Sequence, residues 1–109
     1  MPGPDAIRLK HMLDAAEEAL AFAAGHSRAD LDADRKLVLA LIKLVEIIGE
    51  AAAKVSGETR QRHAAIPWDA VVATRNRLIH GYFDINLDIV WDTVTVDLPP
   101  LLAELRKVA

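Results

Sequence analysis

The 109-residue sequence contains no cysteine. This excludes disulfide bonds, thiolate zinc sites and cysteine nucleophiles, and it suits a reducing cytoplasm. No apolar run approaches the roughly 18–20 residues that cross a bilayer, and the N-terminus lacks the basic-then-apolar order of a signal peptide. A glycine-rich phosphate loop is also missing, and the histidines lack partners at metal-ligand spacing. We therefore expect a cytoplasmic protein without a membrane anchor, a metal or another cofactor.

Positive charge is scarce as well. The chain has 13 Lys and Arg against 16 Asp and Glu, so its formal net charge is −3 and it is not a cationic nucleic-acid binder as a whole. The balance is −3 in residues 1–50 and −3 in residues 84–109, but +3 in residues 51–83. Attraction of a polyanion is therefore expected only in the middle stretch, although unevenness of this size also arises by chance in short acidic proteins.

Apolar residues at helical spacing dominate what is present. Hydrophobic residues make up 52% of the chain, enough for one core, and we expect a single domain over residues 1–109. Glycine and proline divide the chain into helices expected at about 5–24, 32–56, a short turn within 58–66, 67–80 and 87–108. We expect Asp5 to cap the first helix, Gly57 to end the second and Gly81 to end the fourth. The pair Pro99-Pro100 predicts a kink near Asp97.

These elements predict an all-α antiparallel bundle of four to five helices. The helix over 32–56 has an apolar arc so wide that we expect it at the centre of the bundle or in a subunit interface. Gly49 lies near that arc and predicts a close approach of another backbone. Trp68 and Trp91 are expected in the core, and Trp68 is expected to share a helix face with Val72 and Arg75.

Residues 74–83, Thr-Arg-Asn-Arg-Leu-Ile-His-Gly-Tyr-Phe, gather the polar groups that could carry chemistry. Arg75, Asn76, Arg77 and His80 are expected near a helix C-terminus, with Asn76 and His80 on one face. The helix dipole there favours protonated histidine. An arginine grips phosphate oxygens, and a histidine can give or take a proton near neutral pH. Such groups can together support phosphodiester transfer in RNA without a metal.

Acid–base catalysis on both oxygens of the phosphodiester prefers two proton-transfer groups. One chain offers only one near the motif, because its four histidines lie in separate segments. A two-fold dimer would place two copies of Arg75 and His80 around one cleft. The competing interpretation is that both are solvated surface or capping groups. Glu46 and Glu50 are expected in a solvated strip, with a polar lining of the cleft as the alternative.

Two further sets of residues have two interpretations each. His63, with Arg60 and Arg62, is expected at the plain surface, with contact to the RNA backbone as the alternative. Tyr82-Phe83 can begin a core-packed loop rather than form a functional pair.

The stretch from Arg75 to Tyr82 resembles the Arg-x4-His-x-Tyr motif of HepT-like toxins in the HEPN superfamily. The flanking residues 46–52, 66–68, 88–94 and 97–99 are similar to that family in the same order. The resemblance implies an all-helical homodimer acting as a metal-independent endoribonuclease, the toxin of a toxin–antitoxin pair. It also implies a partner, an MntA-like nucleotidyltransferase antitoxin, that neutralises the toxin by transferring AMP to a tyrosine.

From their positions in the motif, the resemblance implies that Arg75 binds the scissile phosphate and that His80 is the acid–base group. Asn76 would position them with support from Arg77, and Tyr82 would be the adenylylated residue. One alternative is a non-catalytic HEPN-type subunit that docks a nucleotidyltransferase and binds nucleotide or nucleic acid. Another is a structural helical dimer with an incidental motif. The intact Arg75, His80 and Tyr82 favour the ribonuclease, because an adaptor does not need them.

Overall fold

The computed structural model describes residues 3–80 and 84–109, with His80 described by its backbone alone. Its architecture is all-α, as predicted, apart from a hairpin of two-residue strands. The long helices are α1 (Pro4–Ala23), α3 (Arg35–Ala53), α5 (Trp68–Leu78) and α7 (Leu98–Val108). The shorter elements are α2 (Asp30–Ala33), α4 (Gly57–Arg62), β1 (Ile79–His80), β2 (Asp84–Ile85), α6 (Leu87–Asp92) and the π-helical segment η1 (Thr93–Asp97).

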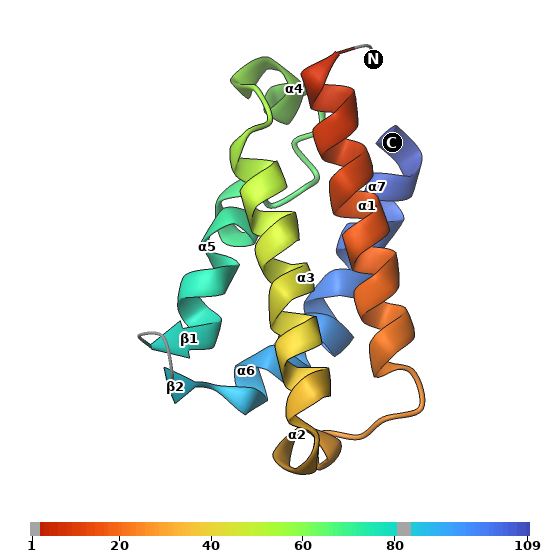
Figure 1. The fold of residues 1–109 in the computed structure, drawn as a ribbon. Coiled ribbons are helices and arrows are strands. Elements are labelled where there is room, and N and C mark those ends of the chain that lie inside the picture. The colour runs from red at the N-terminus through yellow and green to blue at the C-terminus, as the bar shows by residue number, and fades with distance from the viewer. Residues whose placement is uncertain (1–2, 81–83) are drawn as a thin grey trace.

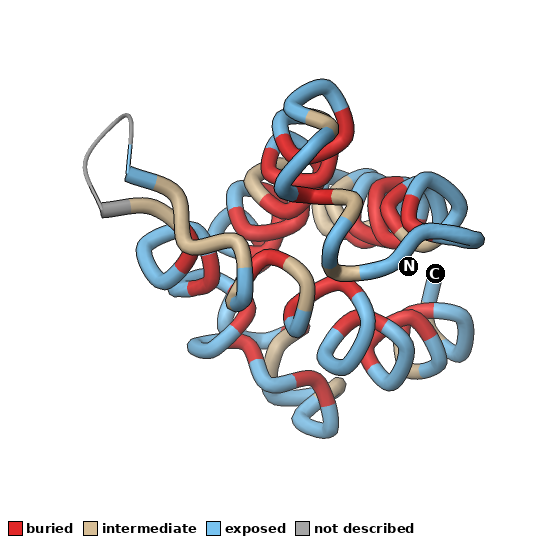
Figure 2. Tube along the Cα trace, turned by 90° about the horizontal axis from the view of Figure 1, so that it is seen from below, coloured by how far each residue is buried: buried red, intermediate tan, exposed pale blue. Residues whose placement is uncertain are grey.

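Helix α3 lies at the centre of the molecule. It packs against α1 on one side and α5 on the other, and α7 packs against α1 (Figure 1). Successive long helices run in opposite directions, and their buried positions face inward (Figures 1 and 2). Leu41, Val45 and Ile48 of α3 are all buried, which explains the wide apolar arc seen in the sequence. None of the described helices combines the length and apolarity needed to cross a membrane.

The helix expected over 32–56 is shorter in the structure, and a capping side chain lies near each of its expected ends. Asp34 interrupts it at the start and accepts a hydrogen bond from the backbone N–H of Leu37 at 3.0 Å, so α3 begins at Arg35. At the other end, the Ser56 hydroxyl caps α4. The prediction that Gly57 ends a helix is therefore wrong, because Gly57 begins α4 instead.

Asp5 also differs from its predicted role as a helix cap. Helix α1 begins at Pro4, and its N-cap is Gly3 with φ of +90°. The Asp5 carboxylate instead accepts hydrogen bonds from the Ser56 N–H at 3.1 Å, the Ser56 hydroxyl at 2.6 Å and the Thr59 hydroxyl at 2.6 Å. Asp5 therefore joins the start of α1 to the start of α4.

This network predicts an acid-sensitive contribution to stability. The hydrogen bonds, first that from the Ser56 hydroxyl, lower the pKa of Asp5 below its ordinary value of 3.8. The contribution is complete above that ordinary pKa and is lost as the pH falls through the lower folded value. We expect the urea midpoint of Asp5→Asn to depend less on pH between 5 and 2 than that of the native protein. Asp14→Asn, on the exposed side of α1, should retain the native pH dependence.

Helix α5 does not bury all of the face that Trp68 was expected to share with Val72 and Arg75. Trp68, Val71 and Thr74 are buried, whereas Val72 is 36% exposed. The reason is the approach of α5 to Gly49, where an added Cβ would lie 3.3 Å from the Val71 carbonyl oxygen. The predicted close approach at Gly49 is therefore confirmed, and it decides which side of α5 is buried.

The last segment changes helix type where the prolines predict a kink. The π-helical turn η1 ends at Asp97, and Pro99 and Pro100 lie in the first turn of α7, where their missing N–H groups cost little. Residues 93–96 alternate in sequence like a strand but belong to the π-helical segment η1. Thr93 is buried in this turn, and its hydroxyl has no hydrogen-bond partner among the described residues.

Candidate active site

The candidate site begins at the end of α5, where the helix stops earlier than predicted. Leu78 is its last residue, and Ile79 has extended backbone angles (φ −129°, ψ 126°). Strand β1 pairs antiparallel with β2, so that His80 faces Asp84, and the Asn86 N–H donates to the Leu78 carbonyl at 2.8 Å. The hairpin thus supplies partners for backbone groups that a helix end leaves unpaired.

Two predictions about His80 are wrong for this reason. His80 lies in strand β1, two residues after the last residue of α5, and not in the last turn of that helix. Nor do Asn76 and His80 share a helix face. Asn76 itself is exposed on α5. The imidazole of His80 and the whole of Gly81 and Tyr82 lie outside the described residues.

Arg75 is held by an acidic residue of the central helix. Its Nε donates to Glu46 Oε1 of α3 at 3.2 Å. The Glu46 side chain is 21% exposed and that of Arg75 is 50% exposed, so the carboxylate is largely covered while the guanidinium is half open to solvent. Glu46 is therefore largely covered and paired with Arg75, rather than part of the solvated strip expected for it. Gly49, one turn further along α3, was the signal in the sequence that another backbone comes close here, and that backbone is α5.

Arg77 points to the other side of α5. Its Nη2 lies 3.7 Å from Asp97 Oδ2 of η1 and donates to the Thr74 hydroxyl at 3.4 Å. The two motif arginines are thus separated, each with a carboxylate from a different element. The structure does not place them in one cluster.

Arg77 lines an elongated groove of about 440 Å³ between α5 on one side and η1 and α7 on the other, with α3 as its floor. We call it the α5–α7 groove. Its walls are mainly apolar, including Val45, Val71, Val96 and Leu101, and Asp97 lies with Arg77 at its polar end. Val96 is 62% exposed and is the most exposed large hydrophobic residue described.

The other sequence candidates have structural partners. Trp68 is in the core as predicted, and its indole N–H donates to the carbonyls of Arg60 and His63, both at 3.2 Å. Arg60 is not a plain surface residue, because its guanidinium lies 5.7 Å from the Trp68 ring and donates to the Ala52 carbonyl at 2.9 Å. Trp91 packs half-buried against the core.

Arg62 forms an exposed ion pair with Glu58, as a surface residue would. Within residues 3–80 and 84–109, no three histidines or acidic residues group closely enough to hold a metal ion.

Comparison with known proteins identifies the family. A model described as "Ribonuclease HepT-like" matches residues 12–108, nearly the whole chain. The chain belongs to the HepT-like ribonuclease family. It is 33% identical over 100 residues to "Putative RNase TTE0752" of Caldanaerobacter subterraneus subsp. tengcongensis, covering 92% of this chain and 89% of the relative. It is 36% identical over 78 residues to "Probable ribonuclease HepT" of Thermococcus cleftensis, covering 72% of this chain and 71% of the relative.

No solved structure gives a significant match. Membership of the HepT-like family and the names of these relatives support an RNase-type function for the chain.

Proposed function

We propose that this chain is the endoribonuclease toxin of a toxin–antitoxin pair, and that it cuts RNA at a site shared by two copies. The observation that carries the proposal is the half-open Arg75 guanidinium, held by Glu46 directly before the hairpin that contains His80. An arginine and a histidine together suit phosphodiester chemistry, because the guanidinium stabilises negative charge and the imidazole moves protons.

The proposed reaction is an internal transfer at phosphorus. The ribose 2′-oxygen loses its proton to a base and forms a new bond to the phosphorus atom. The bond from phosphorus to the 5′-oxygen breaks, and that oxygen takes a proton from an acid. The products are a 2′,3′-cyclic phosphate and a 5′-hydroxyl. His80 of each copy would supply one of the two proton transfers, and Arg75 would stabilise the charge on the phosphoryl oxygens.

The α5–α7 groove supports a second copy of the chain as the partner. Most of the groove is apolar, and the exposed Val96 at its edge offers a side chain that can enter the groove of another copy. The groove also holds both members of an opposite-charge pair, Arg77 and Asp97. In a two-fold interface Arg77 can pair with Asp97 of the other copy, and two chains of net charge −3 meet at a locally neutral surface.

Neutralisation by an antitoxin is the regulatory part of the proposal. An MntA-like nucleotidyltransferase would transfer AMP from ATP to the hydroxyl of Tyr82, two residues after His80 in the sequence. The phenolic oxygen would lose its proton and form the bond to the α-phosphorus, and pyrophosphate would leave. A nucleotide there adds bulk and negative charge beside the proposed site, so it would exclude RNA and repel its phosphates. The support for this step is the family motif in the sequence.

The proposal is tested by incubating the purified protein with RNA in EDTA. We expect cleavage that leaves cyclic phosphate ends, which mass spectrometry of the fragments identifies. RNA binding without cleavage under all conditions would instead favour the non-catalytic adaptor.

Glu46→Gln tests whether the carboxylate positions Arg75. We expect kcat to fall roughly ten- to a hundredfold with a smaller change in KM, because a neutral amide holds the guanidinium less firmly. Glu46→Asp should recover part of the loss. Glu104→Gln, the same change on α7, should have no effect. An unchanged kcat in Glu46→Gln would exclude this role.

Tyr82→Phe separates activity from regulation. The variant should cleave RNA normally, because the hydroxyl is assigned no part in the reaction, yet resist neutralisation by the co-expressed antitoxin. Intact-mass measurement should show added AMP on the native chain and none on the variant. Modification of the variant would place the acceptor at another residue.

A further inference from the structure

The lysines and arginines of the molecule differ in whether a carboxylate neutralises them. Most of them are neutralised by a carboxylate: ion pairs engage Lys10, Arg28, Arg62, Arg75, Arg77, Arg106 and Lys107. Arg60 is bound to a carbonyl and covers Trp68. The cations that have no ion pair within the described part of the chain are Arg8, Arg35, Lys36, Lys43 and Lys54.

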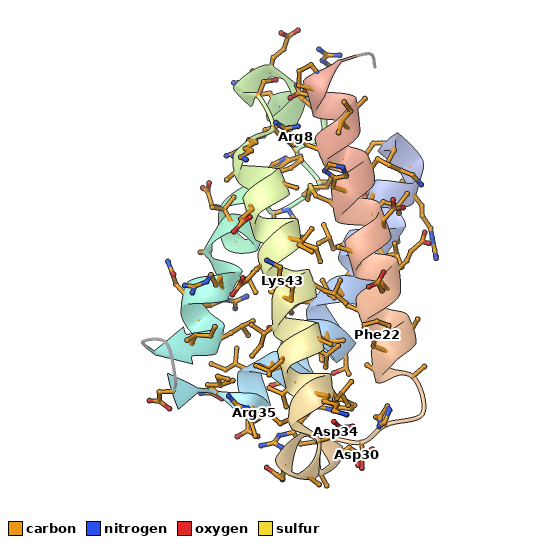
Figure 3. The ribbon with its side chains drawn as sticks, in the orientation of Figure 1. Arg8, Phe22, Asp30, Asp34, Arg35 and Lys43 are labelled. Carbon is orange, nitrogen blue, oxygen red and sulfur yellow. The ribbon has the colours of Figure 1, made fainter. Side chains whose placement is uncertain are left out.

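These five cations are not scattered over the surface. Four of them belong to α3 or follow it directly, and the fifth, Arg8, shares a hollow of about 300 Å³ with Lys54 between α1 and α3. Figure 3 shows Lys43 and Arg35 on α3, and Arg8 on the neighbouring α1. The free positive charge of this acidic protein is therefore concentrated on and beside α3.

Lys36, Lys43 and Lys54 form one stripe, which we call the α3 lysine face. They are separated by 7 and 11 residues, or close to two and three helical turns, and all three are exposed. The stripe is roughly 27 Å long at about 1.5 Å per residue, which is the reach of several nucleotides. Lys43 is one turn from Glu46, the residue that holds Arg75, so the lysine face adjoins the candidate active site.

We propose that the α3 lysine face binds the phosphate backbone of the RNA substrate outside the cleavage site. This inference rests on the proposed ribonuclease function and adds the path of the substrate. Unpaired lysines can each release counterions from a polyanion, whereas the paired cations elsewhere are already neutralised. The face does not suit a membrane surface, because the apolar side of α3 is buried in the core and leaves little to insert into lipid.

Glu50 provides a second test of the proposal. It projects from the same side of α3 and lines the hollow with Arg8 and Lys54. A carboxylate beside a phosphate path repels the ligand. Removing its charge in Glu50→Gln should therefore strengthen RNA binding, while removing the lysine charges weakens it. A general loss of structure would weaken RNA binding in both variants, so it would not produce changes in affinity of opposite sign at neighbouring residues.

The binding test uses a fluorescein-labelled 2′-O-methyl oligouridine of roughly 20 nucleotides, which cannot be cleaved, and fluorescence anisotropy at several salt concentrations. Lys36→Gln/Lys43→Gln/Lys54→Gln should weaken binding roughly tenfold and make the slope of log K against log salt less steep by about 2, near 0.7 for each lost contact. The matched control, Lys10→Gln/Arg106→Gln/Lys107→Gln, removes the same charge from paired residues and should leave the slope unchanged.

Cleavage assays distinguish failure of this inference from failure of the ribonuclease proposal. In the lysine variant, kcat/KM should fall for long RNA and stay constant for a dinucleotide, which is too short to reach the face. Equal loss in the variant and its control, or binding of anionic vesicles in place of RNA, would overturn the α3 lysine face alone. Lysine-dependent RNA binding with no cleavage of either substrate would overturn the ribonuclease function alone.

Discussion

His80→Ala is expected to abolish RNA cleavage while leaving helical content and dimerisation intact. General acid–base catalysis by a positioned side chain contributes about 10²- to 10⁴-fold, and in a shared site the variant removes both imidazoles at once. Arg75→Ala should cause a loss of similar size, because it removes the charge that stabilises the phosphoryl oxygens. The measurement is the initial rate of RNA cleavage in EDTA, with circular dichroism to verify folding.

The matched control is His26→Ala. His26 forms an exposed contact with Asp30 at 2.9 Å, far along the chain from the motif, and its loss should leave the cleavage rate unchanged. Activity that persists in His80→Ala, or disappears in both variants, would move the chemistry to another residue or to a contaminating nuclease.

The second large effect is expected from Val96→Asp. Val96 is 62% exposed in the single chain, so a carboxylate there leaves the fold intact. In the proposed dimer the same carboxylate would enter the apolar groove of the other copy, at the cost of several kcal/mol for an unpaired buried charge. We expect a monomer by analytical ultracentrifugation and at least a hundredfold loss of cleavage, because the composite site cannot form.

Leu39→Asp is the control for this variant. Leu39 is 46% exposed on α3, outside the α5–α7 groove, and the substitution makes the same change from an exposed apolar residue to a carboxylate. It should remain dimeric. A dimeric Val96→Asp variant with normal activity would exclude the groove as the interface, and an active monomer would exclude the composite site itself.

Helix positions followed from local patterns along the chain. The apolar arc of α3, the close approach at Gly49 and the start of a new helix near Pro99 were each readable from spacing and residue type, because they depend on helix geometry alone. Helix ends were less predictable. Asp5 looks like a cap in the sequence, but its carboxylate finds donors on Ser56 and Thr59, which only the folded chain brings near.

In the candidate site too, some features could be predicted from the sequence and others depend on the folded chain. The motif from Arg75 to Tyr82 was visible as residue types at fixed spacing. What the spacing could not show is that the helix stops at Leu78, because pairing with β2 offers the backbone an alternative to a further helical turn. The partner of Arg75 lies 29 residues away, on a helix whose orientation is set by core packing.

The sequence by itself determined the helical class, the wide apolar arc of α3 and the identity of the motif, because each depends on residues that are near neighbours along the chain. The tertiary structure alone decided which carboxylate holds each arginine, which side of α5 is buried and where the unpaired cations gather. These features depend on contacts between helices distant in sequence, and such contacts are selected by the packing of the whole core.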